Sequence, residues 1–151
     1  MNQAIPVEQF GQWLDGLLQP VEKPQAEPAL REWLDGFKQF IAECFANSQS
    51  PFGEGWPSLE HPRSKGHNQD PRPLIDTQTL MQSVTTDEGI IELDDQHLRF
   101  GTQLPYAAYQ QQGTKSIPAR VFLGVPEDEA TRAADIFAKH LIQTLGTPVA
   151  A

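Results

Sequence analysis

The sequence predicts an α+β fold: N-terminal helices, a small antiparallel β-sheet packed by a long C-terminal helix, and long Pro/Gly-rich loops. Three observations support this class. Apolar residues near both ends of the chain recur at three- and four-residue steps, the period of an amphipathic helix. Short alternating runs lie between residues 83 and 125. The 13 prolines and 11 glycines indicate ordered loops. The length fits one structural domain, comprising a helical segment (1–46) and an α+β core (47–151).

Two helices are predicted in the first third of the chain. One covers Val7–Leu18, and the next begins at Pro28, where a missing N–H costs nothing, and stops at Asn47. The motif WLDG occurs in both helices, at 13–16 and 33–36. Its aromatic residues pack the core or join the two helices, or they dock on a neighbouring subunit. Cys44 shares the apolar stripe of the second helix, which indicates a buried, inert thiol.

The region that follows should be a long loop with a short helix at its end. Residues 47–75 are rich in Pro, Gly, Asn and Ser, and Phe52, Trp56 and Leu59 should anchor part of the loop by packing. Asp76 is a suitable N-cap for a helix of about two turns, from which Leu80 and Met81 face inward.

About four strands are predicted for the sheet, in the runs SVTTD, GIIELD, HLRFGT and ARVFLGV. Hairpin turns are expected at 87–89 and 94–96. Pro105 begins a helical turn that ends at Gly113. The C-terminal helix starts at Pro126, and the acids of 127–129 suit the positive end of its dipole. Its predicted buried stripe consists of Ala130, Ala134, Phe137, Leu141 and Leu145.

The charge pattern disfavours tight nucleic-acid binding, because the chain carries a formal charge of -9. Residues 63–72 are the exception, with three bases and one acid. This basic loop is either simply solvated or makes an electrostatic contact with an acidic partner or DNA. No apolar run is long enough to span a bilayer and no signal peptide is recognised, so the chain should stay where it is made. A single cysteine excludes an intramolecular disulfide.

Catalytic and metal-binding patterns are not found in the sequence. The four histidines lack the spacing of a metal-binding helix. A loop metal site of His61, His67 and Asp70 is less plausible than a solvated loop, and His97 beside Asp94 is better explained as a turn. Nucleophile elbows, P-loops and dinucleotide fingerprints are missing. We therefore expect a non-enzymatic protein without metal or cofactor, and an enzyme would need a spatial cluster that sequence does not show.

Two consecutive blocks, FGTQLPYAAYQQQG and IPARVFLGV, resemble the signature of the phage virion morphogenesis family, the tail-completion proteins of Mu-like tailed phages. The blocks PFGEGWPSL and RPLIDTQTLMQSV resemble earlier family segments in the same order. The resemblance covers about Pro51 to Leu145. This chain departs from the family pattern at four positions: Gln78 replaces a usual Gly, Gln111 a usual His, Gln112 a usual aromatic residue and Val121 a usual Pro.

The resemblance implies a structural protein of the head-to-tail neck, made in the host cytoplasm and carried in the virion. It would complete the tail, join it to the head and form a closed ring, expected to be a hexamer. Expected partners are a head–tail connector, tail terminator or tail tube, with DNA passing nearby and no membrane. Alternatives are a tail terminator or head-side connector ring, a non-virion regulatory binding module or, least favoured, a hydrolase or nuclease.

The loops Pro51–Arg72 and Gln110–Arg120 are the predicted docking surfaces, since both are long and stiffened by Pro and Gly. Trp56 is the expected aromatic anchor, unless it folds back into its own core. The accompanying bases are Arg63, Lys65, Arg72, Lys115 and Arg120. The family signature also suggests structural roles for Gly101, Tyr106, Tyr109, Gly113 and Pro118. The tyrosines would position a turn against the sheet, and SIPAR would begin a strand stiffly.

Overall fold

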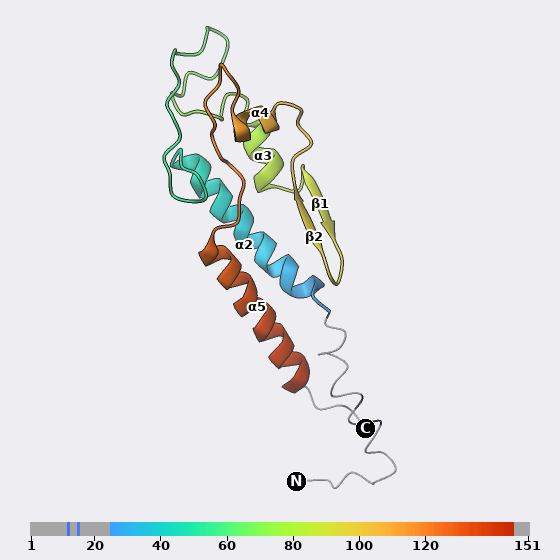
Figure 1. Ribbon diagram of the computed structural model, residues 1–151. Helices are drawn as coiled ribbons and strands as arrows, with labels where there is room; N and C mark the ends of the chain where they lie inside the picture. Colours follow the sequence, from blue (N-terminus) through green and yellow to red (C-terminus); the bar gives the residue numbers. More distant parts are fainter. Residues whose placement is uncertain (1–11, 13–14, 16–24, 147–151) are drawn as a thin grey trace.

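The computed structural model describes residues 25–146 together with Gln12 and Asp15. Its elements are α2 (Glu27–Ala46), α3 (Thr79–Thr85), β1 (Ile90–Leu93), β2 (Leu98–Gly101), α4 (Ala107–Gln112) and α5 (Glu127–Gly146). Figure 1 shows α2 and α5 side by side, and the two-stranded sheet lies next to α2. The α+β class and the small antiparallel sheet are therefore confirmed. Apart from Gln12 and Asp15, the predicted helix 7–18 and the first WLDG motif lie outside the described residues.

Helix α2 forms the spine of the core. Pro28 lies in its first turn, as predicted, and Asn47 follows its last residue. Its buried residues follow helical spacing, and they pack with Trp56, Ile75, Leu80, Val84 and Phe122 from later segments. The Phe37 ring stacks on Trp33 at 4.6 Å and meets Phe100 of β2 edge-on at 6.0 Å. Cys44 is buried, as predicted, and burial raises the pKa of its thiol.

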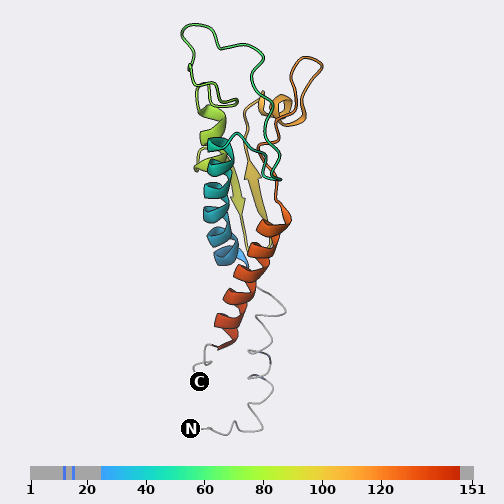
Figure 2. The ribbon, with the colours of Figure 1, turned by 90° about the vertical axis from the view of Figure 1, so that its left-hand side faces the viewer.

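Helix α5 lies antiparallel to α2 and is held there by polar contacts as well as packing (Figure 2). The Trp33 indole Nε1–H donates to the Glu129 carbonyl at 3.0 Å, and Arg132 donates to the Trp33 carbonyl at 2.9 Å. Farther along, Lys139 and His140 both contact Glu32, at 3.1 and 2.6 Å. These bonds fix α5 along α2 although none of its described side chains is fully buried.

The predicted buried stripe of α5 is wrong in part. Ala130, Ala134 and Leu145 are exposed, whereas Ala133 and Ile136 pack against the core. Phe137 and Leu141 are half-buried. The helix is therefore rotated relative to the prediction, because Arg132 and Glu129 anchor it to Trp33 on the side that carries Ala133 and Ile136.

The described sheet has two strands rather than about four. Strands β1 and β2 pair antiparallel, with Ile91 opposite Phe100 and Leu93 opposite Leu98. Asp94 forms the turn between them, since its carboxylate accepts bonds from the amides of Gln96 and His97, each at 2.7 Å. The hairpin at 94–96 and the turn role of His97 are thus confirmed.

The other two predicted strands are absent from the described residues. The first part of SVTTD ends α3, where Val84 is fully buried, so 87–89 joins a helix to a strand instead of two strands. Gly89 fits there because a Cβ would come within 2.0 Å of the Ser83 carbonyl oxygen. Residues 119–126 have no regular structure. In both segments, SVTTD and 119–126, tertiary packing outweighs the local β propensity.

Candidate functional site

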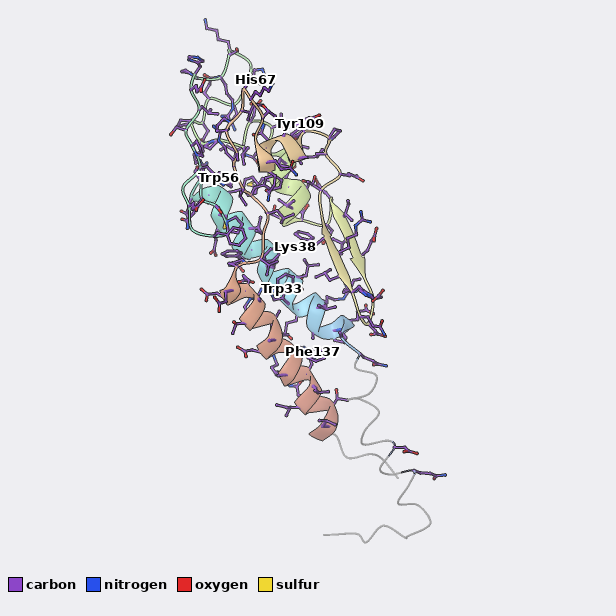
Figure 3. The ribbon with its side chains drawn as sticks, in the orientation of Figure 1. Trp33, Lys38, Trp56, His67, Tyr109 and Phe137 are labelled. Atoms are coloured by element: carbon purple, nitrogen blue, oxygen red, sulfur yellow. The ribbon has the colours of Figure 1, made fainter. Side chains whose placement is uncertain are left out.

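The irregular segments gather at one end of the molecule, which we call the loop end and define as residues 47–78 and 102–126. Both views place this end away from the C-terminal half of α5 (Figures 1 and 2). His67 and Tyr109 lie in it, whereas Phe137 lies far along α5 (Figure 3). Both predicted docking loops, Pro51–Arg72 and Gln110–Arg120, belong to the loop end.

Trp56 is a core residue, which corrects its assignment as an exposed docking anchor. Its residue exposure is 7%. Its ring meets Phe45 edge-on at 5.1 Å, and its indole N–H donates to the Val121 carbonyl at 2.7 Å. The side chain thus closes the upper part of the core and ties the long loop to the segment before α5. The alternative interpretation, in which Trp56 folds back into its own core, is correct.

Arg63 and Arg72 organise the basic loop from within. The Arg63 side chain is only 13% exposed, and its guanidinium donates to the carbonyls of Asn68, Asp70 and Arg72. Arg72 forms a bidentate pair with Asp70, from Nε to Oδ1 and from Nη2 to Oδ2, and its hydrogen bonds lower the pKa of that carboxyl to about 2. These two bases therefore shape the loop, although half of the Arg72 side chain still faces solvent.

Asp76 also belongs to this loop rather than to the cap of α3. Its carboxylate contacts His67 Nδ1 at 2.7 Å and accepts from the Asn68 amide at 3.0 Å, and both bonds lower its pKa. The residue that precedes α3 is Gln78, in a left-handed conformation with φ of 60°. The predicted N-cap is wrong because the Asp76 carboxylate is used by the loop.

Arg120 is buried, which corrects its prediction as an exposed base. Only 6% of the residue is exposed. Its guanidinium donates to the Pro57 carbonyl at 2.8 Å and to the Ser58 carbonyl at 3.0 Å. It forms no ion pair with any described carboxylate, and burial lowers its pKa. Buried cations in proteins are normally paired, so this guanidinium is unusual.

Lys65 and Lys115 differ from the three arginines. Both are exposed, and neither makes a hydrogen bond or ion pair with the part of the chain that the structure describes. Their charges are thus available to a partner, one on each predicted docking loop. Of the five predicted bases, these two and the exposed part of Arg72 remain accessible.

The two signature tyrosines do not pack a turn against the sheet. Tyr106 is 41% exposed and Tyr109 is 59% exposed, while Ala107 between them supplies the buried contact of α4. Pro118 is also exposed, and the SIPAR segment leads into irregular chain instead of a strand. Gly113 ends α4 as predicted, with φ of 75°. Gly101 is the last residue of β2 and pairs with Ile90.

Gln111 has a structural role that the sequence did not indicate. Its amide oxygen accepts from the amides of Phe122 and Leu123, at 2.9 and 3.2 Å, and its amide nitrogen donates to the Leu123 carbonyl at 2.7 Å. The Gln111 side chain thus satisfies main-chain groups of Phe122 and Leu123 that a neighbouring strand would otherwise bind. The signal was the departure from the family pattern at this position, which marked the residue but not its bonds.

A cavity of about 380 Å³ opens at the loop end, between the two docking loops and the start of α3. Its polar lining includes Arg63, Arg120, Asp76, Tyr106 and Gln110, and its apolar lining consists of Leu59, Leu74 and Leu80. The amide oxygen of Gln110 is buried and has no hydrogen-bond partner. The cavity therefore combines a buried cation with an unused polar group.

Among the described residues, no group of three or more side chains could hold a metal ion, and His67 contacts Asp76. The same residues contain no helix with both the length and the apolar character needed to cross a membrane.

The described residues define a small α+β protein whose loop end exposes aromatic and basic side chains around a cavity. The chain belongs to the phage virion morphogenesis family, since the model of that family matches residues 5–142. Over 72 residues it is 42% identical to Mu-like prophage FluMu G protein 2 of Haemophilus influenzae, an alignment that covers 42% of this chain and 49% of that protein. The chain thus spans about half the length of this curated relative. No solved structure matches it.

Proposed function

We propose that the protein is a non-enzymatic component of the phage neck, which completes the tail and joins it to the head by docking its loop end on neighbouring virion proteins. It associates with further copies of itself in a closed ring. Membership of a virion morphogenesis family supports an assembly role. A tail terminator or head-side connector would use the same kind of surface and is the alternative position in the neck.

The observation that carries this proposal is the exposure of Tyr106 and Tyr109 on a short, firmly held helix. Exposed tyrosines with little freedom are typical contact residues, because they bury a large area at low entropic cost. Ala107 fixes α4 to the core and Gln111 fixes it to the chain beyond, so both tyrosines project from a backbone that is held in place. Lys65 and Lys115 add positive charge nearby, which would attract an acidic partner subunit.

Rigidity of the loops is the second support. Arg63 and Arg120 hold the long loop through main-chain carbonyls of residues 57, 58, 68, 70 and 72. A loop that is ordered before binding loses less conformational entropy when it docks. The acidic remainder of the chain would repel passing DNA, which suits a wall near the DNA channel.

Charge reversal tests this placement. Lys65→Glu and Lys115→Glu should each change the free energy of unfolding by no more than about 0.5 kcal/mol, because both side chains are exposed and unpaired. Each should weaken head–tail joining in a complementation assay with purified heads and tails, most strongly at low salt. Arg31→Glu is the control for the change of charge, since Arg31 is exposed on the first turns of α2, away from the loop end, where the change also removes its ion pair with Glu27.

The control decides the interpretation. Normal joining by both loop variants, or an equal defect in Arg31→Glu, would show that the loop end is not the contact surface. Electron microscopy of particles made without the protein should show unattached heads and tails. Finished virions in its absence would assign the protein to another role.

A further inference from the structure

We infer that the loop-end cavity is a carboxylate-binding pocket that receives an acidic side chain from a second copy of this chain. The inference rests on the self-association in the proposed function and gives it a specific contact. The guanidinium of Arg120 is the central feature of this pocket. It is buried, and its two hydrogen bonds, from Nε and Nη2, both go to carbonyl groups. Its Nη1 makes no bond with the described chain.

A carboxylate is the group that best complements this guanidinium. Buried charges are stable when an opposite charge and hydrogen bonds accompany them. No described carboxylate forms an ion pair with Arg120, and the charge of Glu60 offsets only part of the lowering of its pKa by burial. Asp76 lines the same cavity, but its oxygens already serve His67, Asn68 and the nearby Arg63. With two cations and one carboxylate in its lining, the pocket has room for one more negative charge.

The other polar lining groups fit the same ligand. Tyr106 lines the cavity, and its hydroxyl makes no hydrogen bond with the described chain and can donate one. Gln110 also lines the cavity, and its amide oxygen is buried without a partner. Its amide nitrogen makes no hydrogen bond with the described chain and can donate to an incoming carboxylate. Three different side chains can thus donate to the same ligand.

A second copy can supply the missing group. The chain carries 20 acids against 11 bases, so another copy brings many carboxylates to a positive pocket. The segment 125–128 matches the pocket best. Val125 is half-exposed and fits a lining that includes leucines, while Glu127 and Asp128 are exposed and make no ion pair within the described residues. The segment is not part of the pocket lining, so the two surfaces in contact differ. Such a contact is heterologous and able to build a ring.

The first experiment blocks the pocket from inside. In Gln110→Glu a carboxylate attached to α4 would pair with Arg120 and occupy the site of the partner. We expect a melting temperature raised by about 2–4 °C and self-association, measured by sedimentation at low salt, weakened at least tenfold. Gln112→Glu adds the same charge to an exposed position of the same helix and should change neither quantity. Tyr106→Phe, which removes only an exposed hydroxyl, should weaken association without changing stability.

The second experiment is reciprocal. The double variant Glu127→Gln, Asp128→Asn keeps the pocket and loses the acidic segment, so it should also be monomeric. Mixed with Gln110→Glu, which keeps the segment, it should form heterodimers through the one remaining intact contact. Failure to form them would exclude this segment. Unchanged association of Gln110→Glu, or a lowered melting temperature, would overturn the pocket itself.

The outcomes separate this inference from the neck proposal. A wild-type protein that stays monomeric at low salt, with particle assembly still lost in Gln110→Glu, would show that another virion protein fills the pocket and would overturn the second copy as occupant. Weakened self-association of Gln110→Glu with normal virions would support the pocket and contradict the neck function. Normal self-association with unattached tails in the absence of the protein would contradict the pocket only.

Discussion

At the residue scale, three non-glycine residues in the described chain have positive φ: Ser48, Leu74 and Gln78. Left-handed backbone is unfavourable for residues with a Cβ and is kept where the surroundings require it. Leu74 and Gln78 both line the loop-end cavity. Gln78 also replaces the glycine that is usual in the family pattern, and the φ of 60° explains that preference for glycine.

Gln78→Gly should stabilise the protein. Removing the Cβ from a left-handed residue stabilises the folded state by about 1–2 kcal/mol. The extra conformational freedom of glycine in the unfolded chain costs about 0.5–1 kcal/mol. The expected net gain is therefore about 0.5–1 kcal/mol in the free energy of unfolding, measured by urea denaturation. Gln82→Gly is the control: Gln82 is exposed inside α3, where glycine should cost about 1 kcal/mol. A loss of stability in Gln78→Gly would mean that the Gln78 side chain contributes an unseen contact.

At the element scale, the chain from 119 to 126 is held by α4 instead of by a strand. The Gln111 amide provides three hydrogen bonds to Phe122 and Leu123, and Gly113 allows the chain to turn back tightly. A Cβ at Gly113 would come within 2.7 Å of the Ala119 amide nitrogen. Gln111 therefore fixes the segment before α5, together with the Trp56 bond to the Val121 carbonyl and the burial of Phe122.

Gln111→Ala should destabilise the protein by about 2–3 kcal/mol, since part-buried amide and carbonyl groups would lose their partners. Gln111→His should retain part of the stability, because imidazole has one donor and one acceptor. Thermal unfolding of the two variants and of Gln112→Ala, an exposed neighbour, makes the comparison. Equal stability of Gln111→Ala and Gln112→Ala would show that the bonds to Phe122 and Leu123 contribute little.

The sequence predicts elements whose pattern is local and repeated. Helices α2 and α5 and the turn at Asp94 follow from periodicity and turn chemistry. The run at 83–87 misleads because Val84 has β propensity but fills a core position from a helix. The run at 119–125 misleads because its partner is the side chain of Gln111, which no periodicity encodes.

The candidate site divides in the same way. Lys65 and Lys115 are exposed, as a polar loop suggests. Trp56 and Arg120 are buried, because each finds carbonyl partners more than 60 residues away in the chain. Contacts between residues so far apart in the chain depend on the tertiary fold. The sequence alone therefore does not decide whether such residues are exposed or buried.

At the scale of the whole molecule, carboxylates link the separate elements. Glu32 joins α2 to α5 through His140 and Lys139, and Asp87 joins the turn before β1 to Lys38 of α2. Hydrogen bonds from these partners lower the pKa of both carboxyls. Asp70, Asp76 and Asp94 show the same direction within the loop and the hairpin.

The free energy of unfolding should therefore fall on acidification. A carboxyl whose pKa is lowered by folding favours the folded state above its unfolded pKa, about 4, and this contribution disappears as the pH falls toward its folded pKa. Urea denaturation at pH 6, 4, 3 and 2.5 should show the loss mainly below pH 4. Glu32→Gln and Asp70→Asn should each show a shallower fall. Constant or rising stability between pH 4 and pH 2.5 would contradict these links.

The buried thiol of Cys44 has a practical consequence. It is the single cysteine of the chain, and it lies on α2 within the core that every other described element touches. A thiol reagent can reach it only when that core opens, so the labelling rate under native conditions counts opening events. Cys44 is thus a built-in probe of how often the core opens. Slower labelling when copies assemble would show that assembly holds the core shut, without any introduced probe.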